Sequence, residues 1–171
     1  MNQNLLLFLT GLLVLSADQF SKAIVNVYLP VINSSLYWYP YGGIGIFQNI
    51  AGIEFSINHW TNTGAAWGFF GEYQYFLIIL RVFLIAGLSI FLAFFNRHPS
   101  WRFPLVLIIA GALGNVIDFF VYGHVVDMLH FVFWGYDFPV FNIADSAISI
   151  GIVSLFLLSF FEPNKKPAQL S

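Results

Sequence analysis

Cysteine is absent from the 171 residues of this chain, and only 8% of the residues are charged. Without cysteine the chain has no disulfide, no thiolate nucleophile and no cysteine-ligated metal site. Soluble domains carry about 25% charged residues, so this chain has too little charge to cover a soluble surface. Its formal net charge of −2 gives no indication of a nucleic-acid partner.

Hydrophobic residues are abundant instead, at 59% of the chain, with a mean hydropathy of +0.81. A helix needs about 20 apolar residues to cross the hydrocarbon core of a bilayer. Four stretches are long enough: about 5–28, 73–95, 103–122 and 138–161. We therefore predict an all-α membrane protein, a four-transmembrane-helix bundle that forms a single domain over residues 1–171, with a disordered tail at 163–171.

The first stretch has an alternative interpretation as a cleavable signal peptide, because residues 5–17 are apolar and end in two small residues. Signal peptides normally carry basic side chains before the apolar core. Residues 1–4 have none, and apolar residues resume after Lys22. We interpret the segment as a retained helix interrupted by Asp18 and Lys22.

Basic residues are distributed unequally between the segments that connect the spans. They lie in the short connection and in the tail: Arg97, Arg102, Lys165 and Lys166. The segments 29–70 and 123–137 contain neither lysine nor arginine. The positive-inside rule places both termini in the cytoplasm and these two segments outside.

The two outer segments are rich in aromatic residues, which favour the membrane interface. The β-branched pattern at 53–57 indicates short strands. We predict a small β-rich extracytoplasmic platform at the outer interface. A folded cap with no catalytic purpose fits the aromatic residues equally well.

Ionisable side chains within membrane spans are costly and usually functional. Asp18 and Lys22 are four residues apart on one helix face, which predicts a structural ion pair. Asn115 and Asp118 are three apart, so both can point into the bundle. A polar clamp between helices would explain them, and a functional role for Asp118 stays open.

Two more carboxyls are expected near the outer interface. Asp127 follows the third span, and Asp145 is expected two turns into the fourth. Asp145 could be a protonated side chain hydrogen-bonded to a neighbour. Alternatively, two facing carboxyls share one proton, so that the ionised member activates water and the neutral one donates, as in aspartic peptidases. These residues alone leave both interpretations open.

Other chemistries have weaker support in the sequence. No serine has a plausible histidine and acid partner at one membrane depth. His124 and His130 flank Asp127, but no metal-binding spacing accompanies them. We therefore expect no metal site.

Five motifs together resemble bacterial lipoprotein signal peptidase (signal peptidase II) in order and spacing. They are DQFSK at 18–22, NTGAAW at 62–67, GALGNVID at 111–118, GHVVD at 123–127 and FNIADS at 141–146. The resemblance covers nearly the whole chain. It implies an intramembrane aspartic endopeptidase of the bacterial cytoplasmic (inner) membrane. Such an enzyme removes signal peptides from diacylglyceryl-modified prolipoproteins, cutting before the lipidated cysteine at the outer face.

The resemblance also implies roles for individual residues. It maps the catalytic pair onto Asp127 and Asp145. The supporting polar positions that it implies are Asn62, Gly64, Asn115, Asp118, Asn142, Asp18 and Lys22. It implies no metal or organic cofactor, and its partners are lipidated prolipoproteins and membrane lipid. The sequence does not indicate an oligomeric state, and we favour a monomer.

The chain departs from the family pattern in two places. Phe119 follows Asp118 where the family usually has arginine, so substrate range or efficiency is open. Residues 39–45 lengthen the outer segment and have no assigned role. Two other functions stay under consideration: a proton-coupled transporter or channel, since buried carboxylates also mark ion pathways, and a catalytically dead scaffold. The absence of repeat symmetry argues against the transporter, and the presence of both aspartates argues against the scaffold.

Overall fold

The computed structural model describes residues 2–32, 38–63 and 73–161. Four of its helices are long and apolar enough to span a membrane. They are α1 (Gln3–Tyr28), α2 (Gln74–Ile90, continued by a π-helical turn at Phe91–Phe95), α3 (Arg102–Tyr122, preceded by a 3-10 turn at Pro99–Trp101) and α4 (Ile143–Phe161). The predicted four-helix bundle is confirmed. Gly64 and the predicted tail at 163–171 lie outside the described residues.

The fourth helix begins at Ile143, five residues later than predicted. The preceding segment is extended because its backbone bonds to strand β3 (Val125–Phe133). The Phe138 N–H donates to the Phe131 carbonyl at 3.0 Å, and the Phe141 N–H donates to the Leu129 carbonyl at 3.2 Å. Asp145 therefore lies in the first turn of α4, and the expectation that it lies two turns into the helix is wrong.

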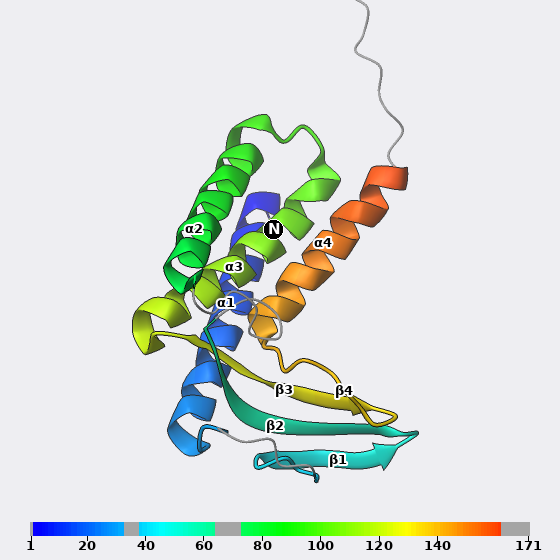
Figure 1. Cartoon of the computed structure of the whole chain (residues 1–171). Helices are drawn as coiled ribbons and strands as arrows, with labels where there is room; N and C mark the ends of the chain where they lie inside the picture. Colours follow the sequence, from blue (N-terminus) through cyan, green and yellow to red (C-terminus); the bar gives the residue numbers. More distant parts are fainter. Residues whose placement is uncertain (1, 33–37, 64–72, 162–171) are drawn as a thin grey trace, which may run out of the picture.

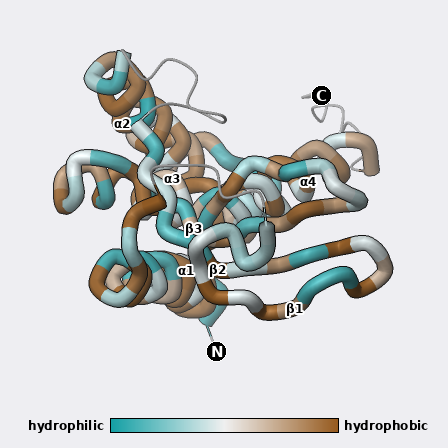
Figure 2. Tube along the Cα trace, turned by 60° about the horizontal axis from the view of Figure 1, so that its bottom comes forward, coloured by the Kyte–Doolittle hydropathy of each residue, from teal (hydrophilic) through white to brown (hydrophobic). Residues whose placement is uncertain are grey.

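An antiparallel sheet covers one end of the bundle (Figure 1). Its strands run in the order β1 (Ile44–Ile50), β2 (Ile53–Asn62), β3 and β4 (Tyr136–Asp137). The hairpin turns Ala51-Gly52 and Trp134-Gly135 both have positive φ at two successive residues, as a two-residue hairpin turn of type I′ requires. The predicted β-rich platform is confirmed, with hydrophobic and hydrophilic segments interleaved along β1 and β2 (Figure 2).

Helix α3 is the central helix and packs against α1, α2 and α4. Small residues on α3 permit this close packing. A Cβ on Gly111 would lie 2.9 Å from Ile148 Cγ1, and one on Gly114 would lie 3.3 Å from Ala144 Cβ. This small-residue interface brings the first turn of α4 against the end of α3 that lies nearest the sheet.

Candidate active site

A fully buried lysine from α1 holds together the polar side chains at the sheet end of the bundle. Lys22 Nζ lies 2.8 Å from Asp18 Oδ2 and 2.6 Å from Asp118 Oδ2, and it donates to Asn115 Oδ1 at 3.0 Å. These three partners match the three N–H donors of an ammonium group. The predicted Asp18–Lys22 pair is confirmed, and Asp118 and Asn115 share the same lysine.

The first turn of α4 is capped from two directions. Asn142 is the N-cap: its Oδ1 accepts from the Asp145 N–H at 2.8 Å, and the Asp145 carboxylate accepts from the Asn142 N–H at 3.3 Å. This reciprocal pattern is a capping box. Asp18 adds a third bond, because its Oδ1 accepts from the Ala144 N–H at 2.9 Å. These bonds stabilise the helix start at Ile143 and fix the position of Asp145.

Asn142 also connects the two candidate catalytic carboxyls. Its Nδ2 donates to Asp127 Oδ1 at 2.7 Å, while its backbone N–H bonds to Asp145. Asn62 Nδ2 donates to the other oxygen of Asp127 at 3.0 Å, and Asn115 Nδ2 donates to Asp145 Oδ1 at 2.8 Å. Asparagine amides therefore hold both oxygens of Asp127. One asparagine amide and one backbone N–H hold the two oxygens of Asp145.

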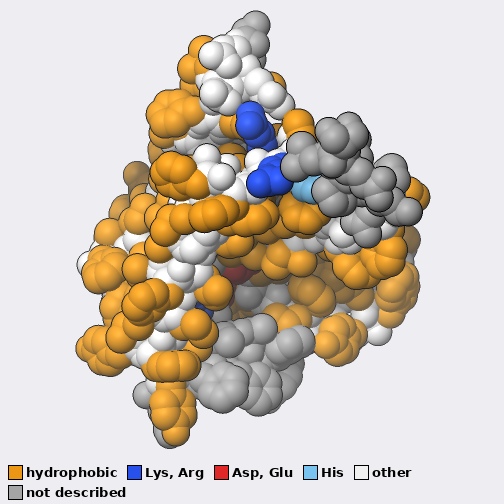
Figure 3. Space-filling view, turned by 90° about the horizontal axis from the view of Figure 1, so that it is seen from above, with side chains coloured by type: hydrophobic (Ala, Val, Ile, Leu, Met, Phe, Trp, Pro, Cys, Tyr) orange, Lys and Arg blue, Asp and Glu red, His pale blue; other side chains and the backbone are white. Residues whose placement is uncertain are grey.

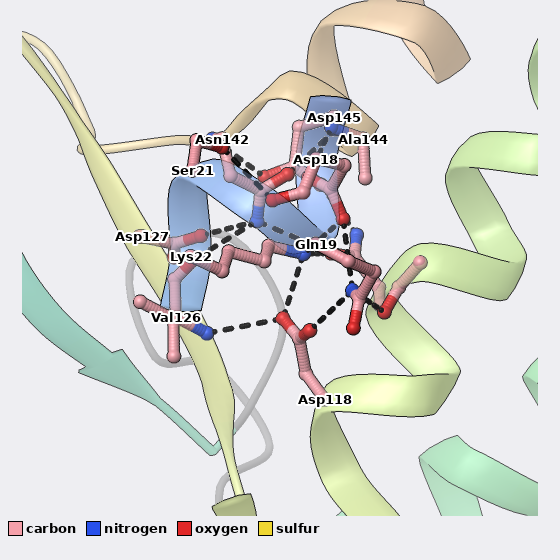
Figure 4. Close-up of polar contacts among 12 residues, drawn as sticks. Asp18, Gln19, Ser21, Lys22, Asp118, Val126, Asp127, Asn142, Ala144 and Asp145 are labelled. Atoms are coloured by element: carbon pink, nitrogen blue, oxygen red, sulfur yellow. Dashed lines mark hydrogen bonds and ion pairs between the residues drawn. The ribbon is translucent and has the colours of Figure 1, made fainter. Parts of the chain in front are cut away.

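Side chains from α1, α3, β3 and α4 converge at this point (Figure 4). Asp127 is only 3% exposed. Burial, and next the negative charge of Asp145, raise the pKa of Asp127 to about 7, although hydrogen bonds from Asn62 and Asn142 oppose the rise. The two carboxyls are thus electrostatically coupled, and Asp127 can hold a proton near neutral pH.

Gln19 belongs to the same cluster and was not singled out from the sequence. Its Nε2 donates to Asp118 Oδ1 at 2.8 Å and to the Gly114 carbonyl at 3.1 Å. Asp118 Oδ2 in turn accepts from the Val126 N–H at 3.2 Å, at the start of β3. The position of Gln19, beside Asp18 on a membrane helix, was the available signal, because an amide in a span needs a partner.

A cleft of about 420 Å3 opens beside Asp127. Its walls are the end of β2 and the following residue (Trp60–Thr63), Asp127 and His130 of β3, and the segment Asp137–Val140. The cleft therefore runs from the carboxyl pair onto the sheet. Asn62, which positions Asp127, is also part of its wall.

A second polar network, on the sheet, borders this cleft. His130 Nε2 lies 2.6 Å from Asp137 Oδ1, and its Nδ1 lies 3.0 Å from Asn58 Nδ2. Because an amide nitrogen is a donor, Nδ1 is the acceptor and Nε2 carries the hydrogen that Asp137 accepts. The ring centroids of Tyr41 and His130 are 4.8 Å apart, and the Tyr41 hydroxyl donates to the Glu54 carboxylate. The additional residues 39–45 thus contribute Tyr41 to a network that reaches the cleft.

Phe119 has an apolar environment where an arginine was expected from the family pattern. Its ring lies edge to face with the Tyr75 ring, with the two ring centroids 5.8 Å apart. It also packs against the buried hydrophobic cluster that contains Ile78 and Val116. Phe119 therefore contributes to the packing of α3 against α2. Among the described residues, no group of three or more histidine, aspartate or glutamate side chains is placed to hold a metal ion.

The fold and these contacts define a polytopic membrane protein with two coupled, amide-held aspartates beside a cleft. Residues 10–161 match the family model described as signal peptidase (SPase) II. The chain is 40% identical to the lipoprotein signal peptidase of Chlamydia trachomatis serovar D, over 93% of both chains. It is 44% identical to the Chlamydia pneumoniae lipoprotein signal peptidase, over 67% of this chain and 68% of that one.

The fold is also found in a solved bacterial membrane enzyme, with a TM-score of 0.75 and 29% identity, covering 96% of this chain and 94% of the other. The chain belongs to the signal peptidase II family. It is thus a multi-pass protease of the bacterial inner membrane, of the aspartic class of that family. This membership favours the peptidase over the transporter that buried carboxylates alone would allow.

Proposed function

We propose that Asp127 and Asp145 are the catalytic pair with which this signal peptidase II removes signal peptides from diacylglyceryl-modified prolipoproteins. The observation that carries the proposal is the bonding of Asn142 to both carboxyls. It is supported by the effect of the Asp145 charge on the pKa of Asp127. Aspartic peptidases require two carboxyls that share one proton.

In the resting enzyme, Asp127 holds the proton and Asp145 is ionised. Asp145 takes a proton from a water molecule, whose oxygen attacks the carbonyl carbon before the lipidated cysteine. Asp127 gives its proton to the carbonyl oxygen, which produces a neutral tetrahedral diol. Asp145 then returns its proton to the leaving nitrogen, and Asp127 recovers one from the diol as the C–N bond breaks. Both carboxyls end the cycle in their starting states.

The asparagines and the buried lysine act by positioning the pair. Asn62, Asn115 and Asn142 hold the carboxyl oxygens, while Asp18, Lys22 and Asp118 fix the helix ends that carry them. The supporting role proposed for Gly64 rests only on the resemblance of the NTGAAW motif at 62–67 to the family. The chain acts as one domain, and a monomer provides both aspartates.

The sheet end of the bundle is proposed to face the outside and both termini the cytoplasm. The support is the placement of Arg97 and Arg102 at the opposite end, in the connection after α2 and at the start of α3. Viewed from that opposite end, the molecule is hollowed, and an acidic side chain lies at the bottom of the hollow (Figure 3).

The test compares purified wild-type protein with Asp127→Asn and Asp145→Asn on a diacylglyceryl-modified prolipoprotein. Asparagine keeps the volume but loses acid–base function, so cleavage should fall by about 10³-fold or more in each variant. Thermal unfolding should show that both variants are folded.

Asp137→Asn is the matched control, because it changes a carboxyl in the same cleft and leaves an oxygen to accept from His130. It should keep most of the activity. Undiminished cleavage by either dyad variant would refute the assignment. Absence of cleavage by the folded wild-type protein would instead favour the inactive scaffold.

A further inference from the structure

A groove of about 590 Å3 lies on the helix bundle at the end away from the sheet. Its walls are the first part of α1, the end of α2 with its π-helical turn, and the first part of α3. Apolar side chains make up most of the lining, among them Leu7, Phe8, Leu12, Val106, Ile109 and Leu113. None of the carboxyls of the proposed active site borders it, so it is separate from the catalytic cleft.

Three polar side chains line the groove, Asn4, Ser89 and Arg102, and two of them lie at one of its ends. Arg102 begins α3 and Asn4 lies in the first turn of α1, and both line the groove. Among the described residues, Arg102 makes no ion pair with a carboxylate. The stretches 2–17 and 74–117, which supply the walls of the groove, contain no aspartate or glutamate. The groove thus has a positive end and a largely apolar body.

The length of the groove limits what it can hold. Leu113 lies eleven residues after Arg102 on α3, which is about 17 Å at 1.5 Å per residue. The hydrocarbon core of a bilayer is about 30 Å thick. The groove therefore extends through about one leaflet, which suits an acyl chain and is too short for a spanning helix.

We propose that this groove binds an anionic phospholipid, with one acyl chain along α3 and the phosphate at Arg102. A guanidinium group binds phosphate with paired hydrogen bonds, and the Asn4 amide can donate to an ester carbonyl. Signal peptides begin with a positively charged region, which Arg102 would repel. Charge and length therefore both favour a lipid over the signal peptide of a substrate.

The experiment measures thermal unfolding of the full chain in detergent, with phosphatidylglycerol or phosphatidylcholine of identical acyl chains. At tenfold excess over its Kd, phosphatidylglycerol should raise the Tm of the wild type by roughly 3–6 °C, and phosphatidylcholine by less. Arg102→Gln should remove the difference between the two lipids. Arg97→Gln, at an exposed arginine outside the groove, should keep it.

A second pair of variants tests the acyl-chain site. Ala93 lines the groove, so Ala93→Phe should fill it and reduce stabilisation by both lipids. Ile90→Phe changes an exposed residue outside the groove and should have no such effect. Equal stabilisation by both lipids in the wild type would overturn the proposal, as would equal effects of Arg102→Gln and Arg97→Gln. The inactive Asp127→Asn protein should retain the lipid response, so this test is independent of the peptidase assignment.

Discussion

Two polar networks meet at the proposed active site, and they differ in their access to water. The helix cluster (Asp18, Lys22, Asn115 and Asp118) is buried in the bundle, and three of its members are 0% exposed. The sheet network (Tyr41, Glu54, Asn58, His130 and Asp137) reaches the surface, since the Asp137 side chain is 75% exposed. Water can replace a lost partner at the exposed Asp137 of the second network, but not in the helix cluster. The two should therefore respond very differently to substitution.

The largest effect is expected from Lys22→Met in the helix cluster. The substitution keeps the apolar stem but leaves Asp18 and Asp118 without their shared cation. Breaking a buried ion pair costs about 3–5 kcal/mol, so the Tm should fall sharply. Thermal unfolding in detergent measures the loss, and Arg97→Met at the exposed connection is the control. An unchanged Tm would show that the cluster does not stabilise the bundle.

Asp18→Ala should come next in size, at about 3 kcal/mol. It removes the partner of Lys22 and also the acceptor of the Ala144 N–H at the start of α4. Stability should therefore fall at least as clearly as peptidase activity, when both are measured on the same preparation. A variant of full stability that lacks activity would instead give Asp18 a catalytic role.

The pH dependence should reveal the proton on Asp127. Its pKa is raised to about 7 in the folded protein, from 3.8 in the unfolded chain. Between these two values the folded state binds the extra proton, so the contribution of Asp127 to stability falls as pH rises through this window. Above about pH 7 the proton donor is lost, and kcat/KM should fall about tenfold per pH unit.

The pH prediction is checked by a kcat/KM profile and by unfolding of the wild type and Asp127→Asn across the same range. Asp127→Asn should flatten the change in stability between pH 4 and 7. An activity profile that keeps rising through pH 9 would contradict the assignment of the proton.

The smallest effect is expected in the sheet network. His130→Asp places a carboxyl beside Asp137 and should loosen the Asp137–Val140 wall of the cleft. Because the Asp137 carboxyl is 75% exposed and can turn toward water, the loss of substrate-binding free energy should be about 1 kcal/mol, a roughly fivefold rise in KM with little change in kcat. The double variant His130→Asp/Asp137→His restores the pair and keeps the Asn58 amide as a donor. It should recover most of the KM, and failure to do so would exclude this positioning role.

Much of the architecture follows from local properties of the sequence. The four spans depend on runs of apolar residues, and the ends of α1, α2 and α3 agree with the predicted spans to within two residues. The predicted start of α4 was wrong, because apolar residues do not distinguish a helix from an extended segment that is hydrogen-bonded to β3. The capping pattern from Asn142 to Asp145 was present as a local signal, and it marks the correct start.

The composition by itself determined that this chain lies in a membrane, because so few charges cannot cover a soluble surface. The spacing of Asp18 and Lys22 determined their pairing, since both lie on one helix turn. Only the tertiary structure decided that Lys22 also binds Asp118, that Asp18 caps α4, and that Asn142 connects Asp127 with Asp145. These contacts join residues up to 126 positions apart. No local pattern encodes them, because they arise only when the helices and the sheet pack together.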